Sequence, residues 1–220
     1  MKNTRTKTLY LVELSILTAL TIVLQLLGSL LTGFTGLPMS FVLIPIVIAA
    51  IHLGPMAGAW LGAVFGIVTI IMGFSGLDPF TNVLLNNFGI IKMLICIALC
   101  MVKAIVAGLG SGFLYKGLNK LFKGKNVTLT TILTAIAAPL LNTGIFIIGM
   151  LLFYFNDTAA IQTGIAEILK IELPKETIVP PMKYIFLVLV GWNFISEFAI
   201  NLIISPAVSR VIDVVRKKRN

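Results

Sequence analysis

The chain alternates between long apolar runs and short polar hinges. Six runs can be distinguished, namely Tyr10–Leu31, Met39–Ile51, Met56–Met72, Ile90–Leu114, Leu129–Phe155 and Tyr184–Ala207. A helix needs about 20 mostly apolar residues to cross a bilayer, at a rise of about 1.5 Å per residue. Four runs reach that length, and the second and third are shorter because His52, Gly54 and Pro55 interrupt one apolar stretch. The pattern predicts an all-α integral membrane bundle of six transmembrane helices.

The composition agrees with this pattern. Hydrophobic residues make up 58% of the chain and charged residues 11%, and the mean hydropathy is +1.06. Soluble domains average about 25% charged residues. Nearly all of the 220 residues lie in apolar runs or short connections. We therefore expect a single membrane-embedded domain over residues 1–220.

The net charge of +9 is concentrated in three segments. These precede the first run, join the fourth to the fifth and follow the sixth, and their basic residues are Lys2, Arg5, Lys7, Lys116, Lys120, Lys123, Lys125, Arg210, Arg216, Lys217, Lys218 and Arg219. If the chain crosses the membrane at each run, all three segments face one compartment. Lysine and arginine in short loops are retained in the cytoplasm during insertion, so both termini are predicted to be cytoplasmic. This placement favours contact with anionic lipid and not with nucleic acid.

Small residues recur at a spacing of four in two of the runs. They are Gly54, Gly58, Gly62 and Gly66 in the third region and Ala104, Gly108 and Gly112 in the fourth. Such spacing lets two helix backbones approach closely in lipid, so we expect tight packing inside the bundle. Ser15 and Ala19 have the same spacing in the first run, where spacing alone favours internal packing over a face for a partner helix.

Polar side chains within the apolar runs mark candidate functional positions, because such groups are costly at bilayer depth. They are Gln25, Lys92, Lys103, Asn142, Trp192, Asn193, Glu197 and Asn201. Counted from the ends of their runs, Lys103, Asn142 and Glu197 fall at similar depth, which predicts a polar cluster. Two interpretations stay open: Lys103 forms an ion pair with Glu197, or it meets a ligand.

The remaining candidates have simpler interpretations. An outer loop is expected from Gly73 through Asn87; its glycines, aromatics and amides suit a lid over a small polar molecule. Within it, Asp78 is expected to be solvated, and Asn86 or Asn87 is placed to cap the next helix. His52 is expected to be structural, because no carboxylate is evident nearby.

No residue set indicates catalysis or metal binding. Cys96 and Cys100 lie one helical turn apart, too few ligands for a metal site, and are expected to be packing residues. No Walker A motif occurs, so the chain is not expected to hydrolyse ATP itself. We expect no enzyme activity and no cofactor.

Three short motifs occur in a fixed order along the predicted helices. They are Ser15-x-x-x-Ala19, Gly54–Pro55-x-x-Gly58 and Lys103-x-x-x-x-Gly108. With six helices and both ends inside, the chain resembles over almost its whole length the substrate-binding S components of energy-coupling factor (ECF) vitamin transporters. That family more often has two alanines at the first motif.

Four further stretches most resemble the pantothenate-type members, namely residues 43–48, 62–66, 139–144 and 201–207. The resemblance implies that the chain captures a vitamin from outside a bacterial cell (plasma) membrane with high affinity. It then docks through Ser15 and Ala19 on a transmembrane coupling subunit carried by two cytoplasmic ATPase subunits, and releases the vitamin inside. Under this resemblance, a partner surface becomes the favoured interpretation of Ser15 and Ala19.

Pantothenate offers a carboxylate, an amide and two hydroxyls. The expected site residues are Gln25, Asn87, Lys103, Asn142, Trp192, Asn193 and Glu197. Lys103 would meet the carboxylate unless Glu197 neutralises it, and Trp192 would cover the dimethyl group. The alternatives are an S component for another vitamin such as folate or thiamine, because a fold does not fix its ligand, and a stand-alone secondary transporter in which Lys103 and Glu197 couple ions or protons.

Overall fold

The computed structural model describes residues 2–35, 41–186, 194–195, 198–199 and 202–203. In this part of the chain every regular element is a helix, as the sequence predicted. The elements are α1 (Lys2–Thr35), α2 (Leu43–His52), α3 (Pro55–Ser75), α4 (Pro79–Asn86), α5 (Gly89–Leu121), α6 (Val127–Phe153), η1 (Phe155–Asp157), α7 (Thr158–Leu169), η2 (Lys175–Thr177) and α8 (Pro181–Lys183).

Four of the described helices are long and apolar enough to cross a membrane: residues Lys7–Leu31 of α1, and the whole of α3, α5 and α6. These helices identify the chain as a membrane-embedded protein. The second predicted run forms the 10-residue helix α2, which is shorter than a membrane span. Most of the sixth predicted run, Tyr184–Ala207, lies outside the described residues.

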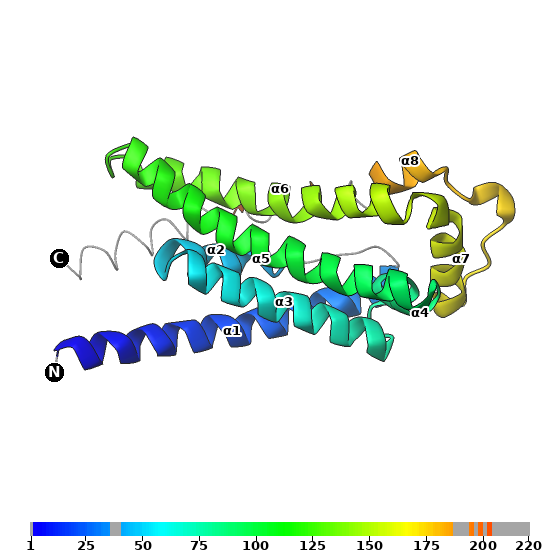
Figure 1. Ribbon diagram of the computed structural model, residues 1–220, viewed down its shortest axis with the longest axis horizontal. Coiled ribbons are helices and arrows are strands. Elements are labelled where there is room, and N and C mark those ends of the chain that lie inside the picture. Colours follow the sequence, from blue (N-terminus) through cyan, green and yellow to red (C-terminus); the bar gives the residue numbers. More distant parts are fainter. Residues whose placement is uncertain (1, 36–40, 187–193, 196–197, 200–201, 204–220) are drawn as a thin grey trace.

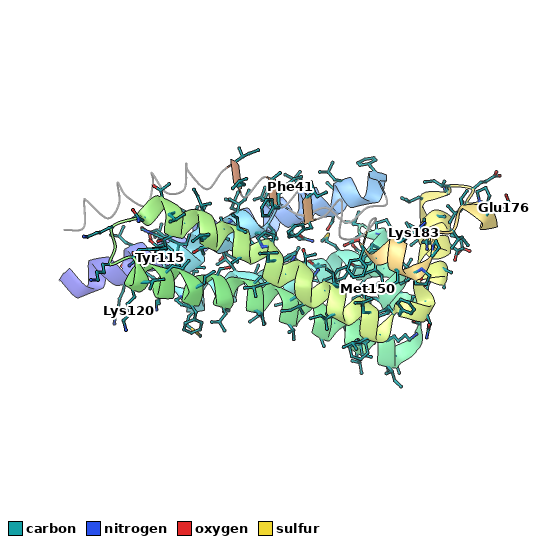
Figure 2. The ribbon with its side chains drawn as sticks, turned by 90° about the horizontal axis from the view of Figure 1, so that it is seen from above. Phe41, Tyr115, Lys120, Met150, Glu176 and Lys183 are labelled. Atoms are coloured by element: carbon teal, nitrogen blue, oxygen red, sulfur yellow. The ribbon has the colours of Figure 1, made fainter. Side chains whose placement is uncertain are left out.

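The long helices lie roughly side by side, and α4, α7 and α8 gather at one end of them (Figure 1). We call this end the capped end. Glu176 and Lys183 lie at the capped end, whereas Lys120, in the basic hinge between α5 and α6, lies at the opposite end (Figure 2). The start of α1 also lies at the end opposite the cap (Figure 1). Two of the basic segments found in the sequence are therefore on the same side of the bundle.

A glycine–proline pair separates α2 from α3. The backbone N–H of Gly54 donates to the carbonyl of Ala49, closing α2. Gly54 itself has φ 108°, a conformation that favours glycine. Pro55 then occupies the first turn of α3. A backbone N–H has no intrahelical acceptor at this position, so proline loses no hydrogen bond there. The local sequence thus reverses the chain direction with few residues.

The small-residue stripes of α3 and α5 pack tightly inside the bundle, as predicted, and the structure shows that they pack against each other. A Cβ added to Gly58 would lie 2.5 Å from the carbonyl oxygen of Gly108, and one added to Gly62 would overlap the carbonyl of Ala104. Further along, a Cβ on Gly112 would lie 2.5 Å from the Cα of Pro55. Backbones that approach this closely gain dispersion contacts that larger side chains would prevent.

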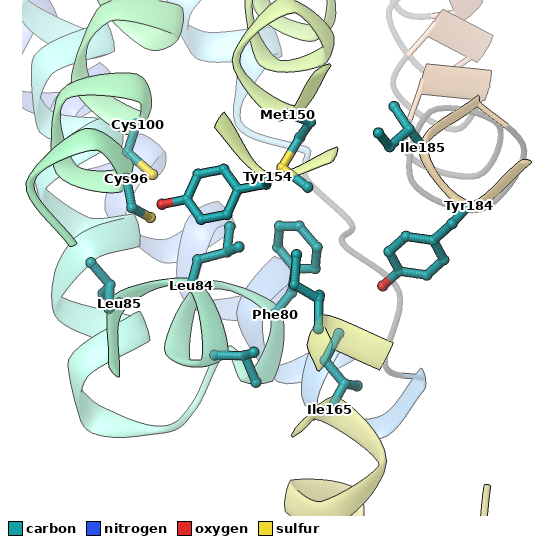
Figure 3. Close-up of a cluster of buried hydrophobic side chains, with 12 residues drawn as sticks. Phe80, Leu84, Leu85, Cys96, Cys100, Met150, Tyr154, Ile165, Tyr184 and Ile185 are labelled. Atoms are coloured by element: carbon teal, nitrogen blue, oxygen red, sulfur yellow. The ribbon is translucent and has the colours of Figure 1, made fainter. Parts of the chain in front are cut away.

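The capped end contains its own hydrophobic cluster, contributed by α4, α5, α6 and α7 (Figure 3). Cys96 and Cys100 are free thiols buried in this cluster, in agreement with their expected packing role. Tyr154 is also fully buried there, and its hydroxyl donates to the backbone carbonyl of Lys92 at 2.6 Å. The ammonium of Lys92 forms an ion pair with Asp157, so the ends of α5 and α6 are held together.

Two connections between the long apolar runs contain helices of their own. The expected loop from Gly73 to Asn87 contains α4, and the connection after α6 contains α7. Asp78 stabilises the start of α4 by accepting from the backbone N–H of Thr81 at 3.2 Å, and Pro79 occupies the first turn. Neither Asn86 nor Asn87 caps α5, because Phe88 stands at its N-cap position.

Candidate functional site

Lys103 lies in the interior part of α5, a membrane-length helix, and is half-buried. Its Nζ atom is 4.8 Å from the ring centre of Phe146 on α6 and 5.8 Å from that of Phe65 on α3. Both rings are within the range of cation–π attraction. Among the described residues, no carboxylate lies within 4.0 Å of this ammonium. The rings stabilise the charge in part, and the ammonium retains the capacity to bind an anion.

Asn142 lies one helical turn from Phe146 on α6. Its side chain is 2% exposed, and its Oδ1 atom has no hydrogen-bond partner in the described part of the chain. The hydroxyl of the adjacent Thr143 is likewise buried and unpaired there. A buried polar group without a partner costs about 1–3 kcal/mol, so these atoms are candidate contacts for a ligand that donates hydrogen bonds.

Gln25 faces the interior of the bundle from α1. It is 4% exposed, and its Nε2 atom donates to Ser29 Oγ at 3.3 Å. Its Oε1 atom has no hydrogen-bond partner among the described residues. Thr21, Gln25 and Ser29 are four residues apart and all buried, so α1 has a polar stripe on its inner face. No described hydrogen bond joins this stripe to Lys103 or Asn142.

Asp78 is buried, which contradicts the expectation of a solvated loop residue. Its carboxylate accepts from the backbone N–H of Thr81 and, at 2.8 Å, from the Thr81 hydroxyl. Burial raises the pKa of Asp78, while the Thr81 hydrogen bonds and the attraction of Lys103 oppose that increase. The sequence did not indicate that Asp78 is buried, because its burial depends on how α4 packs against α3 and α5.

Of the other predicted ligand contacts, only Asn87 lies among the described residues, and it is not beside Lys103. Asn87 is exposed at the end of α4. Its Nδ2 atom would lie 3.0 Å from a Cβ on Gly164, so it lies beside α7. The predicted contacts Trp192, Asn193 and Glu197 lie outside the described residues, and so does the Lys103–Glu197 pair.

Ser15 and Ala19 are both exposed on α1. The hydroxyl of Ser15 donates to the carbonyl of Leu11 in its own helix, at 2.8 Å. Internal packing, which the spacing alone favoured, is therefore wrong for these residues. They lie on a face of α1 that points away from the described bundle.

His52 has a carboxylate neighbour that sequence reasoning missed. Its Nε2 atom is 3.3 Å from Oε2 of Glu13, so the pair joins the end of α2 to α1. The described residues contain no group of three or more histidine, cysteine, aspartate or glutamate side chains placed to hold a metal ion. The Glu13–His52 pair is a connection between helices within the described bundle.

Comparison with known proteins found no match to the chain among protein-family models, curated proteins or solved structures.

Proposed function

We propose that this protein is the substrate-binding S component of an ECF-type vitamin importer, with pantothenate as its substrate. The observation that carries the proposal is the ammonium of Lys103, which lies between two aromatic rings with no described carboxylate within 4.0 Å. Charges within membrane helices are rare and usually have a partner or a function. A ligand carboxylate would provide the partner.

Two buried acceptor atoms without a described partner favour a ligand with hydrogen-bond donors. Asn142 Oδ1 and Gln25 Oε1 are acceptors, and both are buried. The two hydroxyls and the amide N–H of pantothenate are donors. The rings of Phe65 and Phe146 offer apolar contact for its dimethyl group. A ligand without these donors would leave the acceptors unpaired, which is how such a site discriminates.

The proposed topology has six crossings, made by the four long helices, by the second apolar run (Met39–Ile51), of which α2 forms only a part, and by the sixth apolar run. The start of α1 and the basic hinge of Lys120 lie at one end of the bundle. Because basic segments are retained in the cytoplasm, this end is proposed to face the cytoplasm of a bacterial cell, with both termini inside. The capped end then faces the exterior, where the vitamin would enter.

The proposed partner is a transmembrane coupling subunit associated with two cytoplasmic ATPase subunits. The outward-facing Ser15 and Ala19 support this proposal, because small side chains leave a flat surface on which another helix can pack. The absence of a Walker A motif from the sequence is compatible with ATP hydrolysis on separate subunits.

We expect Ser15→Trp and Ala19→Trp to abolish vitamin uptake in cells while leaving vitamin affinity nearly unchanged. The indole would obstruct a partner helix, but the exposed positions leave room for it in the isolated subunit. Uptake of labelled vitamin and titration of the purified variants measure the two quantities. Leu20→Trp, a second exposed position on α1 outside the Ser15–Ala19 pair, is the matched control. Loss of affinity in the Ser15 or Ala19 variants would contradict the docking role.

The proposed function is tested by isothermal titration of the purified protein with pantothenate in the absence of ATP. We expect saturable binding, with folate and thiamine failing to compete. Binding of folate or thiamine but not of pantothenate would reject the substrate and keep the transporter class. If none of the three vitamins binds, the proposal is wrong.

A second candidate function is a stand-alone proton-coupled transporter. The buried carboxyl group of Asp78, whose pKa is raised by burial and which is attracted by Lys103, favours it. Uptake driven by a pH gradient into liposomes that contain this chain alone would support the second candidate over the first.

A further inference from the structure

We propose that Asp78 takes up a proton when an anionic ligand binds beside Lys103, so that the affinity of the site for anions depends on pH. The inference rests on the proposed function, because it assumes a carboxylate ligand. It adds Asp78, which the resemblance did not include. It also adds a condition on binding: the protein would take up one proton for each singly charged anion that it binds.

The geometry places the start of α4 against the surroundings of Lys103. Phe80, two residues after Asp78, contacts the ring of Phe146 edge-on at 5.8 Å between centres. The ammonium of Lys103 also contacts that ring, 4.8 Å from its centre. Phe80 also lies in the cluster that contains Cys96 and Cys100 (Figure 3), and these thiols lie on the same face of α5 as Lys103.

The charged and titratable groups around Asp78 are few. From α5, Lys103, Cys96 and Cys100 interact with it electrostatically. The sequence of α3 contains no titratable residue, and in α1 every titratable residue lies between its start and Glu13, so the part of α1 after Glu13 has none. On α7, Glu167 is exposed to the surroundings of the protein. Within the described residues, Lys103 is therefore the only cation that acts on the Asp78 carboxyl group.

The balance of charges links the two groups. Burial disfavours the ionised form of Asp78, and the attraction of Lys103 opposes that effect. A ligand carboxylate beside Lys103 would neutralise the ammonium and add a second negative charge near Asp78. Both changes raise the pKa of Asp78 further. At a pH between its values in the free and bound protein, binding must therefore take up a proton.

The direction of the pH dependence follows from this linkage. Above the pKa of Asp78 in the free protein, ligand affinity should fall as the pH rises, by at most about tenfold per pH unit for one linked proton. Measurements above about pH 6 avoid titrating the carboxyl group of the ligand itself. A neutral analogue, the alcohol pantothenol, should show no such dependence, because it leaves Lys103 charged.

Titration calorimetry in two buffers of different ionisation enthalpy measures the linked proton directly. We expect proton uptake when pantothenate binds the wild type, none when pantothenol binds, and none when pantothenate binds Asp78→Asn. Asparagine retains the capping geometry toward Thr81, so this variant is expected to fold. Asp157→Asn, which removes a carboxylate that pairs with Lys92, is the matched control and should retain the proton uptake.

The outcomes separate the two proposals. Pantothenate binding with equal proton uptake in wild type and Asp78→Asn would overturn this inference and leave the proposed function intact. Absence of binding by any carboxylate vitamin would overturn both. Infrared spectra recorded across the same pH range provide a second readout, because a protonated Asp78 gives a carbonyl stretch that Asp78→Asn lacks. Absence of that band in the ligand-bound wild type would also overturn the inference.

Discussion

Replacing Gly108 with leucine should destabilise the bundle more than any other single substitution considered for this protein. A Cβ at this position would overlap the backbone carbonyl of Gly58 and lie 3.1 Å from the Cγ2 atom of Ile46. Overpacking usually costs about 1–3 kcal/mol when side chains can move aside. Here the obstacle is the backbone of α3, so we expect a cost at or above about 3 kcal/mol, equivalent to a melting temperature about 6–12 °C lower.

The same helix provides a matched control. Gly117 is exposed on α5, and a Cβ there meets no atom within 4 Å. Gly117→Leu should therefore fold and melt like the wild type in the same detergent. Thermal unfolding followed by size-exclusion chromatography measures both variants. If Gly108→Leu melts within about 2 °C of the wild type, a shift of less than about 1 kcal/mol, the close approach of α3 and α5 is not essential for stability.

Close packing at the small-residue stripes could be predicted from the sequence alone, whereas the pairing of α3 with α5 comes from the structure. Gly58, Gly62 and Gly108 were recognised because a four-residue spacing of small residues has one main physical use in lipid. The break at Gly54–Pro55 was predictable for a similar reason, since proline suits the first turn of a helix. In both cases the constraint is local, and it is visible in a few neighbouring residues.

The capped end was not predictable in the same way. Helix α4 has eight residues, and most of them are buried by packing with other elements. A Cβ on Gly73 of α3 would lie 2.6 Å from the Cγ2 atom of Thr81, so α4 fits closely against α3 only because Gly73 has no side chain. The burial of Asp78 follows from that contact. Such pairings depend on tertiary structure, and the apolar pattern of a short segment does not determine them.

The candidate site was predicted in part. Hydropathy identified Gln25, Lys103 and Asn142 as polar groups inside apolar runs, and the structure buries two of them and half-buries Lys103. Counting depth along each run did not show that Phe65 and Phe146 would flank the ammonium. The partner of His52 was missed because Glu13 is distant in sequence.

Replacing Lys103 with methionine should weaken the binding of pantothenate by about 10–100-fold. A hydrogen bond to a charged group contributes about 1.5–3 kcal/mol, and each 1.4 kcal/mol changes an affinity about tenfold. Methionine removes the ammonium but keeps an unbranched apolar stem, so contact with the rings of Phe65 and Phe146 is largely retained. Titration calorimetry at a fixed pH near 7 measures the loss of affinity, because the carboxyl group of the ligand is ionised at about that pH.

Two comparisons distinguish a direct contact from a structural effect of Lys103. Pantothenol has no carboxylate, so its affinity should change little between wild type and Lys103→Met. Lys92→Met removes a cation of α5 that pairs with Asp157 at the capped end. This variant should have a lower melting temperature, but its affinity for pantothenate should stay close to that of the wild type. An equal loss of affinity for pantothenate and pantothenol in Lys103→Met would mean that Lys103 acts through the packing of α3, α5 and α6. A selective loss for pantothenate would instead assign the ligand carboxylate to the Lys103 ammonium, because only that pair of groups differs between the two titrations.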